Sequence, residues 1–130
     1  MKKTIIIIEG EPDIRDYLTA VLEDKGYTIC TVRENKNVID AVRSHNPDLI
    51  ILDIMMPQRS GISIYKELRT THDISSIPIA MLSVISQKSD LMRDTFHAYL
   101  LNESIPPPDG FIEKPLKIPS LEKTIELLIK

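Results

Sequence analysis

Glu9, Asp53, Ser83 and Lys114 each stand at the end of a run of apolar residues. Carboxylate oxygens are the ligands that a hard divalent cation such as Mg²⁺ prefers. A lysine and a hydroxyl facing those acids would hold the oxygens of a phosphoryl group. A cation beside an aspartate neutralises its charge and that of an incoming phosphate, so the aspartate becomes a competent nucleophile. If the four side chains meet, they predict metal-assisted phosphoryl transfer onto Asp53.

The apolar runs that carry these residues are predicted to be β-strands. They are short, rich in β-branched residues and continuously apolar, which is typical of strands buried on both faces of a sheet. The predicted strands are Thr4–Ile8, Tyr27–Val32, Asp48–Asp53, Ile77–Ser83 and Gly110–Ile112.

Segments with helical spacing of apolar residues lie between and after these strands. The first is predicted to begin at Pro12 and to be closed by Gly26, because proline suits a first helical turn and glycine a helix end. The second stops before Pro47. The expected helices contain Ile14–Leu22, Val38–Val42, Ile62–Leu68, part of Gln87–Leu101, and Leu121–Leu128.

Strands that alternate with helices predict an α/β fold with helices on both faces of a parallel sheet. Right-handed crossovers favour a flavodoxin-like, doubly wound, five-stranded parallel sheet of strand order 2-1-3-4-5 with five helices. In such a sheet, ligands bind beyond the carboxyl ends of the strands, where the strand order reverses. The fold therefore brings the four candidate residues to one edge.

Composition limits the class of protein. The chain has 130 residues, 42% hydrophobic and 27% charged, which predicts one globular domain. The net charge of −3 gives no electrostatic footprint for nucleic acid. The first apolar run is too short for a signal peptide or a membrane span. One cysteine, Cys30, is compatible with a reducing compartment, and we expect a cytoplasmic location.

Three motifs in sequence order resemble one known family. PDLIILDIMMPQRSG (Pro47–Gly61) is similar to the phosphoacceptor segment of the receiver domains of two-component response regulators. IPIAMLS (Ile77–Ser83) resembles the family's strand that ends in Thr or Ser, and GFIEKP (Gly110–Pro115) resembles the strand that carries its Lys-Pro pair. The resemblance covers nearly all of the chain and implies a single receiver domain over residues 1–130.

The resemblance also implies roles for individual residues. Asp53 would accept a phosphoryl group from a histidine kinase. Ser83 would bond a phosphoryl oxygen, and Lys114 would pair first with Asp53 and then with the phosphate. Phe111 would be the aromatic switch residue that turns inward when Ser83 moves, and the Lys114–Pro115 bond would be cis. Beyond its own phosphorylation and dephosphorylation, no enzymatic activity is implied.

The metal site implied by the resemblance departs from the family pattern. Glu9, Asp53 and the backbone carbonyl of Met55 would bind Mg²⁺. Receivers usually carry a second acid where this chain has Gly10. Because affinity depends on the number and charge of the ligands, we expect a weakened magnesium site.

A second departure is the long segment between Ser83 and Lys114, which contains LLNESIPPPDG (Leu100–Gly110). Its prolines favour a stiff polyproline stretch for a partner groove. Alternatively, it is an insertion that covers the edge of the fifth strand. Expected partners are a histidine kinase, an unidentified protein target and a second copy bound through the fourth helix, fifth strand and fifth helix. Neither nucleic acid nor membrane is an expected partner.

Three other functional classes compete with the phosphorylated switch. A pseudo-receiver, which keeps the fold as an interaction module without using phosphate, is favoured by Gly10. A haloacid-dehalogenase-type phosphatase needs an acid two residues after its nucleophile, where this chain has Met55. A flavodoxin-like nucleotide binder needs a Gly- or Ser/Thr-rich loop after the first strand, where this chain has EGEPD. The sequence therefore disfavours the phosphatase and the nucleotide binder, and the phosphorylated switch and the pseudo-receiver remain as alternatives.

Overall fold

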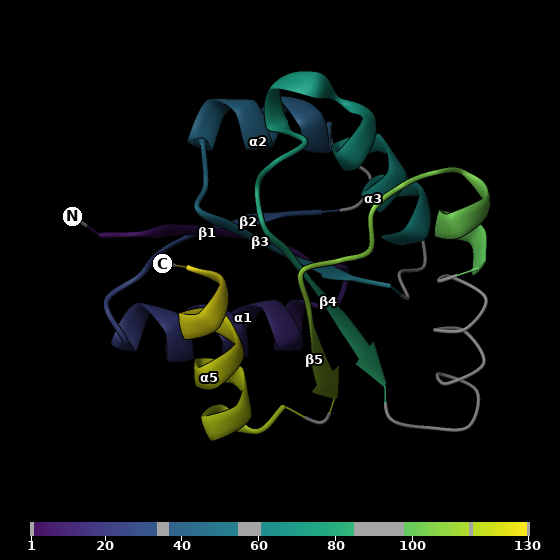
Figure 1. Cartoon of the computed structure of the whole chain (residues 1–130). Coiled ribbons are helices and arrows are strands. Elements are labelled where there is room, and N and C mark those ends of the chain that lie inside the picture. Colours follow the sequence, from purple (N-terminus) through teal and green to yellow (C-terminus); the bar gives the residue numbers. More distant parts are fainter. Residues whose placement is uncertain (1, 34–36, 55–60, 85–97, 115, 130) are drawn as a thin grey trace.

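The computed structural model describes residues 2–33, 37–54, 61–84, 98–114 and 116–129 (Figure 1). Strands and helices alternate along these parts of the chain, as the sequence predicts. Residues 98–102 are also helical. The remaining elements are β1 (Thr4–Ile8), α1 (Pro12–Asp24), β2 (Thr28–Val32), α2 (Val38–His45), β3 (Leu49–Asp53), α3 (Gly61–Thr70), the 3₁₀-helix η1 (His72–Ile74), β4 (Ile79–Val84), β5 (Gly110–Lys114) and α5 (Ile118–Leu128).

The five strands form one parallel sheet in the order β2-β1-β3-β4-β5. In Figure 1, α2 and α3 cover one face of the sheet, and α1 and α5 cover the other. The predicted α/β fold and the predicted strand order are therefore confirmed. With residues 98–102, the four α-helices give the five helical segments that were expected.

The isoleucines of β1 supply both layers of the core because successive side chains of a strand point to opposite faces. Ile6 and Ile8 belong to the cluster beneath α2 and α3, whereas Ile5 and Ile7 belong to the cluster beneath α1 and α5. All four are fully buried. The continuous apolar run thus reflects a central strand covered on both sides.

Local sequence sets the helix boundaries. Pro12 is the first residue of α1, and Gly26, with a φ of 95°, follows its end. Asn37 caps α2 by accepting a hydrogen bond from the Asp40 amide, and the left-handed Asn46 closes it. No helix in the described parts of the chain is long and apolar enough to cross a membrane.

The structure differs most from the predicted strand boundaries at β4 and β5, whereas β2 and β3 each begin one residue later than predicted. Ile77 and Pro78 precede β4 rather than opening it, and β5 extends two residues beyond Ile112 to Lys114. The extension follows from pairing, since Glu113 and Lys114 lie opposite Ser83 and Val84 of β4. Lys114 is therefore held by a strand, not by a loop.

The proline-rich segment before β5 is anchored on the body of the domain. Ile105 is buried in the core cluster beneath α2 and α3. The carbonyl of Pro106 accepts a hydrogen bond from the Tyr65 hydroxyl of α3 at 2.7 Å, and the Asp109 amide donates to the carbonyl of Ile79 at 2.9 Å. These contacts hold the segment against α3 and the start of β4.

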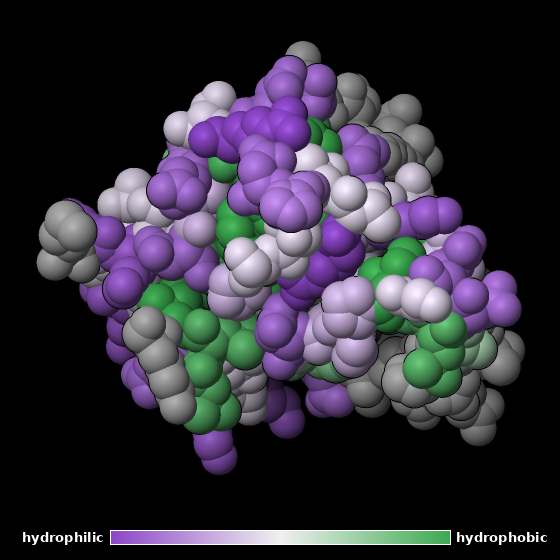
Figure 2. Space-filling view, turned by 45° about the horizontal axis from the view of Figure 1, so that its top comes forward, coloured by the Kyte–Doolittle hydropathy of each residue, from purple (hydrophilic) through white to green (hydrophobic). Residues whose placement is uncertain are grey.

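One face of the domain is mostly polar. Figure 2 shows hydrophilic side chains over most of one face, interrupted by apolar side chains at the lower left and at the right of the view. Leu101 and Leu127 are the most exposed of the large hydrophobic residues in the described chain. Leu101 lies in the helical segment 98–102, and Leu127 lies in α5.

Candidate functional site

Lys114 joins the two acids that the sequence places at strand ends. Its ammonium nitrogen Nζ lies 2.9 Å from Oδ2 of Asp53 and 3.1 Å from Oε2 of Glu9. The side chains of Asp53 and Glu9 are 2% and 1% exposed, and that of Lys114 is 14% exposed. Parallel strands β1, β3 and β5 end at the same edge of the sheet, which is why three residues so distant in sequence meet.

Glu9 is a buried acid beside a second acid. Burial, hydrogen bonding to the Asp53 side chain and the negative charge of Asp53 raise the pKa of Glu9 from 4.5 to about 7, although Lys114 acts in the opposite direction. Oε1 of Glu9 also accepts a hydrogen bond from the backbone amide of Glu11 at 3.2 Å. Glu9 therefore holds its proton to a much higher pH than an exposed glutamate does.

Lys114 remains a cation in this setting. Burial lowers the pKa of Lys114, but its hydrogen bond to Asp53 and the charges of Asp53 and Glu9 outweigh burial and raise it. The site thus contains a firmly protonated amine between two carboxyl groups. Such an amine attracts the oxygens of an anionic group that approaches Asp53.

Gly61 approaches the backbone of Asp53 more closely than any other residue type would permit. A Cβ atom at Gly61 would lie 2.0 Å from the carbonyl oxygen of Asp53 and 2.8 Å from Cα of Ile54. The amide of Gly61 donates a hydrogen bond to the carbonyl of Ile54 at 3.1 Å. The first residue of α3 therefore rests directly on the end of β3, next to the candidate nucleophile.

The other predicted site residues are only partly covered by the structure. Ser83 lies in β4 opposite Glu113, and its side chain lies outside what the structure describes. Met55 and Pro115 lie outside the described residues, so the carbonyl ligand and the cis bond remain predictions. Phe111 lies in β5 with 38% of its surface exposed.

A shallow, mainly apolar concavity adjoins Lys114. It has a volume of about 240 Å³ and is lined by Asp13, Ile14, Tyr17, Lys114 and Leu116. Tyr17 follows the helical spacing of the apolar residues of α1, but it is 42% exposed. Periodicity alone did not reveal this concavity, because it forms only where α1 meets the end of β5.

The two acids of the site have the donor chemistry that a magnesium ion requires. Mg²⁺ commonly takes one or two carboxylates and completes its shell with water and phosphate oxygens. Glu9 and Asp53 supply two carboxyl groups that converge on one point, so their chemistry fits that ion. Among the described residues, no three side chains of His, Cys, Asp or Glu gather at a common point. The described site therefore offers two acids, in agreement with the glycine at position 10.

Comparisons with known proteins identify the family to which this domain belongs. The family model of the response regulator receiver domain matches residues 5–126.

The chain belongs to the response regulator receiver domain family.

Two curated relatives and one solved structure illustrate the breadth of this family. The polar-differentiation response regulator DivK of Brucella ovis is 26% identical over 126 residues, which cover 97% of this chain and 95% of DivK. The DNA-binding response regulator MtrA of Mycolicibacterium smegmatis is 31% identical over 92 residues, which cover 71% of this chain but 39% of MtrA. The chemotaxis protein CheY4 of Vibrio cholerae superimposes with a TM-score of 0.78 at 21% identity, over 98% of this chain and 99% of CheY4, and supports the fold.

Receiver domains act in two-component signalling, where phosphorylation and dependence on Mg²⁺ are general properties of the family. They interact with histidine kinases and with downstream effectors.

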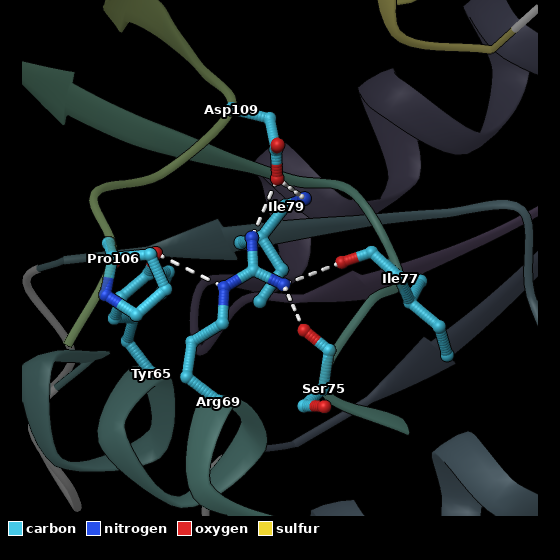
Figure 3. Close-up of polar contacts among 7 residues, drawn as sticks. All are labelled: Tyr65, Arg69, Ser75, Ile77, Ile79, Pro106 and Asp109. Atoms are coloured by element: carbon cyan, nitrogen blue, oxygen red, sulfur yellow. Dashed lines mark hydrogen bonds and ion pairs between the residues drawn. The ribbon is translucent and has the colours of Figure 1, made fainter. Parts of the chain in front are cut away.

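Sequence reasoning missed one polar cluster altogether. Arg69 near the end of α3 contacts Tyr65 and Asp109 and two backbone carbonyls (Figure 3). A single arginine at the end of an amphipathic helix carries no signal of a buried role, because most such residues are solvated. The Asp-Gly pair at residues 109 and 110 indicates a turn at most.

Proposed function

We propose that this chain, acting as one receiver unit over residues 1–130, is a phosphorylation-controlled switch whose phosphoacceptor is Asp53. The observation that carries the proposal is the convergence of Asp53, Glu9 and Lys114 at the carboxyl edge of the sheet. A buried carboxylate bonded to a lysine is oriented for attack, and the lysine stabilises the additional negative charge that the reaction brings.

In the proposed reaction, an oxygen of the Asp53 carboxylate forms a bond to phosphorus as the N–P bond of a kinase phosphohistidine breaks. The bonding electrons remain on the histidine ring, which takes up a proton. Lys114 Nζ, now 2.9 Å from Oδ2 of Asp53, would bond a phosphoryl oxygen in the product. No reaction on any external substrate is proposed beyond this phosphorylation and its reversal by water.

Glu9 and Asp53, with the carbonyl of Met55, would hold the magnesium ion that the family uses. When bound, the ion would neutralise negative charge between the carboxylate and the phosphoryl oxygens. Glu9 would serve as the acid on the metal side because Gly10 provides no side chain. We propose that the affinity for Mg²⁺ is lower than in a receiver with two acids after β1.

The apolar concavity beside Lys114 is the proposed side of approach for the kinase. Its lining residues Ile14, Tyr17 and Leu116 would contact apolar side chains around the donor histidine. Asp13 on its rim would add a charge that discriminates between kinases. The donor phosphate would then reach Asp53 past Lys114, the most exposed member of the trio.

Ser83 and Phe111 would connect phosphorylation to partner binding. The hydroxyl of Ser83 would bond the phosphoryl group, and the ring of Phe111, now 38% exposed, would turn inward into the space that is freed. Large apolar side chains are exposed on each element of the expected output face, namely Leu101, Phe111, Ile118 and Leu127. We propose this face as the site for a target protein or for a second copy of the chain.

Acetyl phosphate and Mg²⁺ provide a direct test without knowledge of the kinase. Intact-mass measurement of the wild-type chain should show one phosphate adduct, and Asp53→Asn should show none. The Asp73→Asn variant, which changes an exposed aspartate paired with Arg43, is the matched control and should be phosphorylated as the wild type is. An adduct that persists in Asp53→Asn would remove Asp53 as the acceptor.

A pseudo-receiver is the second candidate function. It is favoured by Gly10, which stands where a receiver usually carries a second acid. A chain that takes no phosphate even at saturating donor and metal, yet unfolds cooperatively, would support this alternative. Restoration of the adduct by Gly10→Asp would then locate the defect in the missing acid.

A further inference from the structure

Arg69 is a buried cation that holds three separate segments together (Figure 3). Its side chain is 5% exposed. One guanidinium nitrogen donates to the carbonyls of Ser75 and Ile77 at 3.0 and 2.7 Å, and another donates to Oδ2 of Asp109 at 2.5 Å. The remaining nitrogen donates to the hydroxyl of Tyr65, whose ring lies 5.2 Å from the guanidinium carbon. Arg69 therefore ties the end of α3 to the starts of β4 and β5.

Asp109 transmits this attachment to the sheet. The Oδ2 atom that binds Arg69 also accepts a hydrogen bond from the amide of Ile79 at 2.9 Å, and the amide of Asp109 donates to the carbonyl of Ile79 at 2.9 Å. Ile79 and Asp109 thus form a reciprocal pair immediately before the first rung of the ladder, which joins Ala80 to Gly110. The pair fixes which residue of β5 lies opposite which residue of β4.

The burial pattern of β5 gives the strand a single apolar anchor. It is an edge strand of five residues, and Ile112 is its one buried residue. A strand with a single apolar anchor can slide more easily than one with several, because the alternation of buried and exposed residues is what specifies register. The contacts of Asp109 supply a second, polar anchor at the opposite end from Lys114.

The register of β5 decides where the amine of Lys114 lies. A slip by one residue would turn Lys114 to the other face of the sheet. A slip by two residues would move it by about 6.6 Å along the strand. Either shift would remove Nζ from its contacts of 2.9 and 3.1 Å with Asp53 and Glu9. Lys114 therefore depends on contacts made at the far end of its own strand.

We propose that Arg69 and Asp109 are positioning residues for Lys114: by pinning the start of β5 to Ile79 and α3, they hold the lysine amine between the two site acids. The effect of Arg69 and Asp109 on phosphorylation rests on the function proposed above. Their effect on the register of β5 does not depend on that function. The polar cluster at the amino-terminal end of β5 thus determines the position of Lys114 at the carboxyl-terminal end of the same strand.

The test compares Asp109→Ala with Asp109→Asn and with Asp73→Ala. Asp109 is 43% exposed at its side chain, so its replacement leaves no large cavity. Asparagine at position 109 keeps a side-chain oxygen that can accept the hydrogen bonds of Ile79 and Arg69. Asp73→Ala is the control for loss of an Arg–Asp pair elsewhere, because Asp73 pairs with Arg43 on the surface. Each variant is made in the wild-type chain and in Lys114→Ala, and the rate of phosphorylation by acetyl phosphate is measured for the folded fraction.

We expect Asp109→Ala to lower the rate about tenfold, as misplacement of a reacting group does, and Asp109→Asn to restore most of it. In the Lys114→Ala background, Asp109→Ala should have no further effect, because the residue that it positions is gone. An equal loss in both backgrounds, or a loss equal to that of Asp73→Ala, would overturn the proposal.

Two measurements decide the register claim even if the wild-type chain takes no phosphate. Amide hydrogen exchange of residues 110–114 should accelerate in Asp109→Ala and not in Asp73→Ala. The side-chain NMR signals of Lys114 should shift toward those of a solvent-exposed lysine in the same variant. Unchanged exchange and unchanged Lys114 signals would refute the positioning role, whereas absence of phosphate on the wild type would refute only the proposed function.

Discussion

Replacement of Gly61 by alanine should damage the site through backbone contact alone. A Cβ atom there would lie 2.0 Å from the carbonyl oxygen of Asp53, whereas real Cβ contacts shorter than 3.0 Å essentially never occur. The two segments must therefore separate by at least 1.0 Å, the difference between these two distances. The nearest atoms all belong to the backbone of Asp53 and Ile54, so no flexible side chain can yield.

This separation has two measurable consequences. Overpacking of a well-packed interior costs about 1–3 kcal/mol of the free energy of unfolding. A displacement of about 1 Å at a reacting group lowers a rate by up to roughly 10²-fold. We therefore expect Gly61→Ala to lower both the urea midpoint and, more strongly, the rate of Asp53 phosphorylation by acetyl phosphate, measured by intact mass on the folded fraction.

Gly26→Ala is the matched control. Gly26 has a φ of 95°, but nothing lies within 4 Å of a Cβ atom placed on it. Its replacement should cost about 1–2 kcal/mol of stability through the left-handed backbone and leave the phosphorylation rate unchanged. If Gly61→Ala retained the wild-type rate, or if both variants slowed the reaction equally, the contact between α3 and Asp53 would have no special role in positioning the nucleophile.

Two further predictions concern the acids of the site. Gly10→Asp should raise the affinity for Mg²⁺ roughly tenfold or more because it adds a carboxylate. Calorimetric titration would measure this affinity, and an unchanged value would show that position 10 does not face the ion. Glu9→Gln should change how stability depends on pH. Because the folded-state pKa of Glu9 is raised from 4.5 to about 7, its proton stabilises the fold fully below pH 4.5, and this contribution is lost as the pH rises toward 7. Glutamine does not titrate, so the variant's free energy of urea unfolding, relative to wild type, should be higher above pH 7 than below pH 4.5; a pH-independent difference would refute the assignment.

The sequence determined the order of elements and the identity of the strand-end residues. Continuous apolar runs such as Thr4–Ile8 predict strands covered on both faces, and the placement of Glu9 and Asp53 after two of them predicts neighbouring carboxyl groups. These inferences succeed because they depend on burial and on chain direction, which the local sequence encodes. The three motifs around Asp53, Ser83 and Lys114 added the family, which the comparison confirms.

Only the tertiary structure decided how these residues act on one another. Lys114 reaches Glu9 across 105 positions of sequence, and that distance of about 3 Å depends on the pairing of every strand between them. The raised pKa of Glu9 depends on burial and on Asp53, and neither can be inferred from the sequence around Glu9. The contact of Gly61 with Asp53 and the link from Arg69 through Asp109 to β5 depend in the same way on packing between segments. Local sequence fixes what each residue is able to do, whereas the ladder register and the helix placement determine which partner it meets.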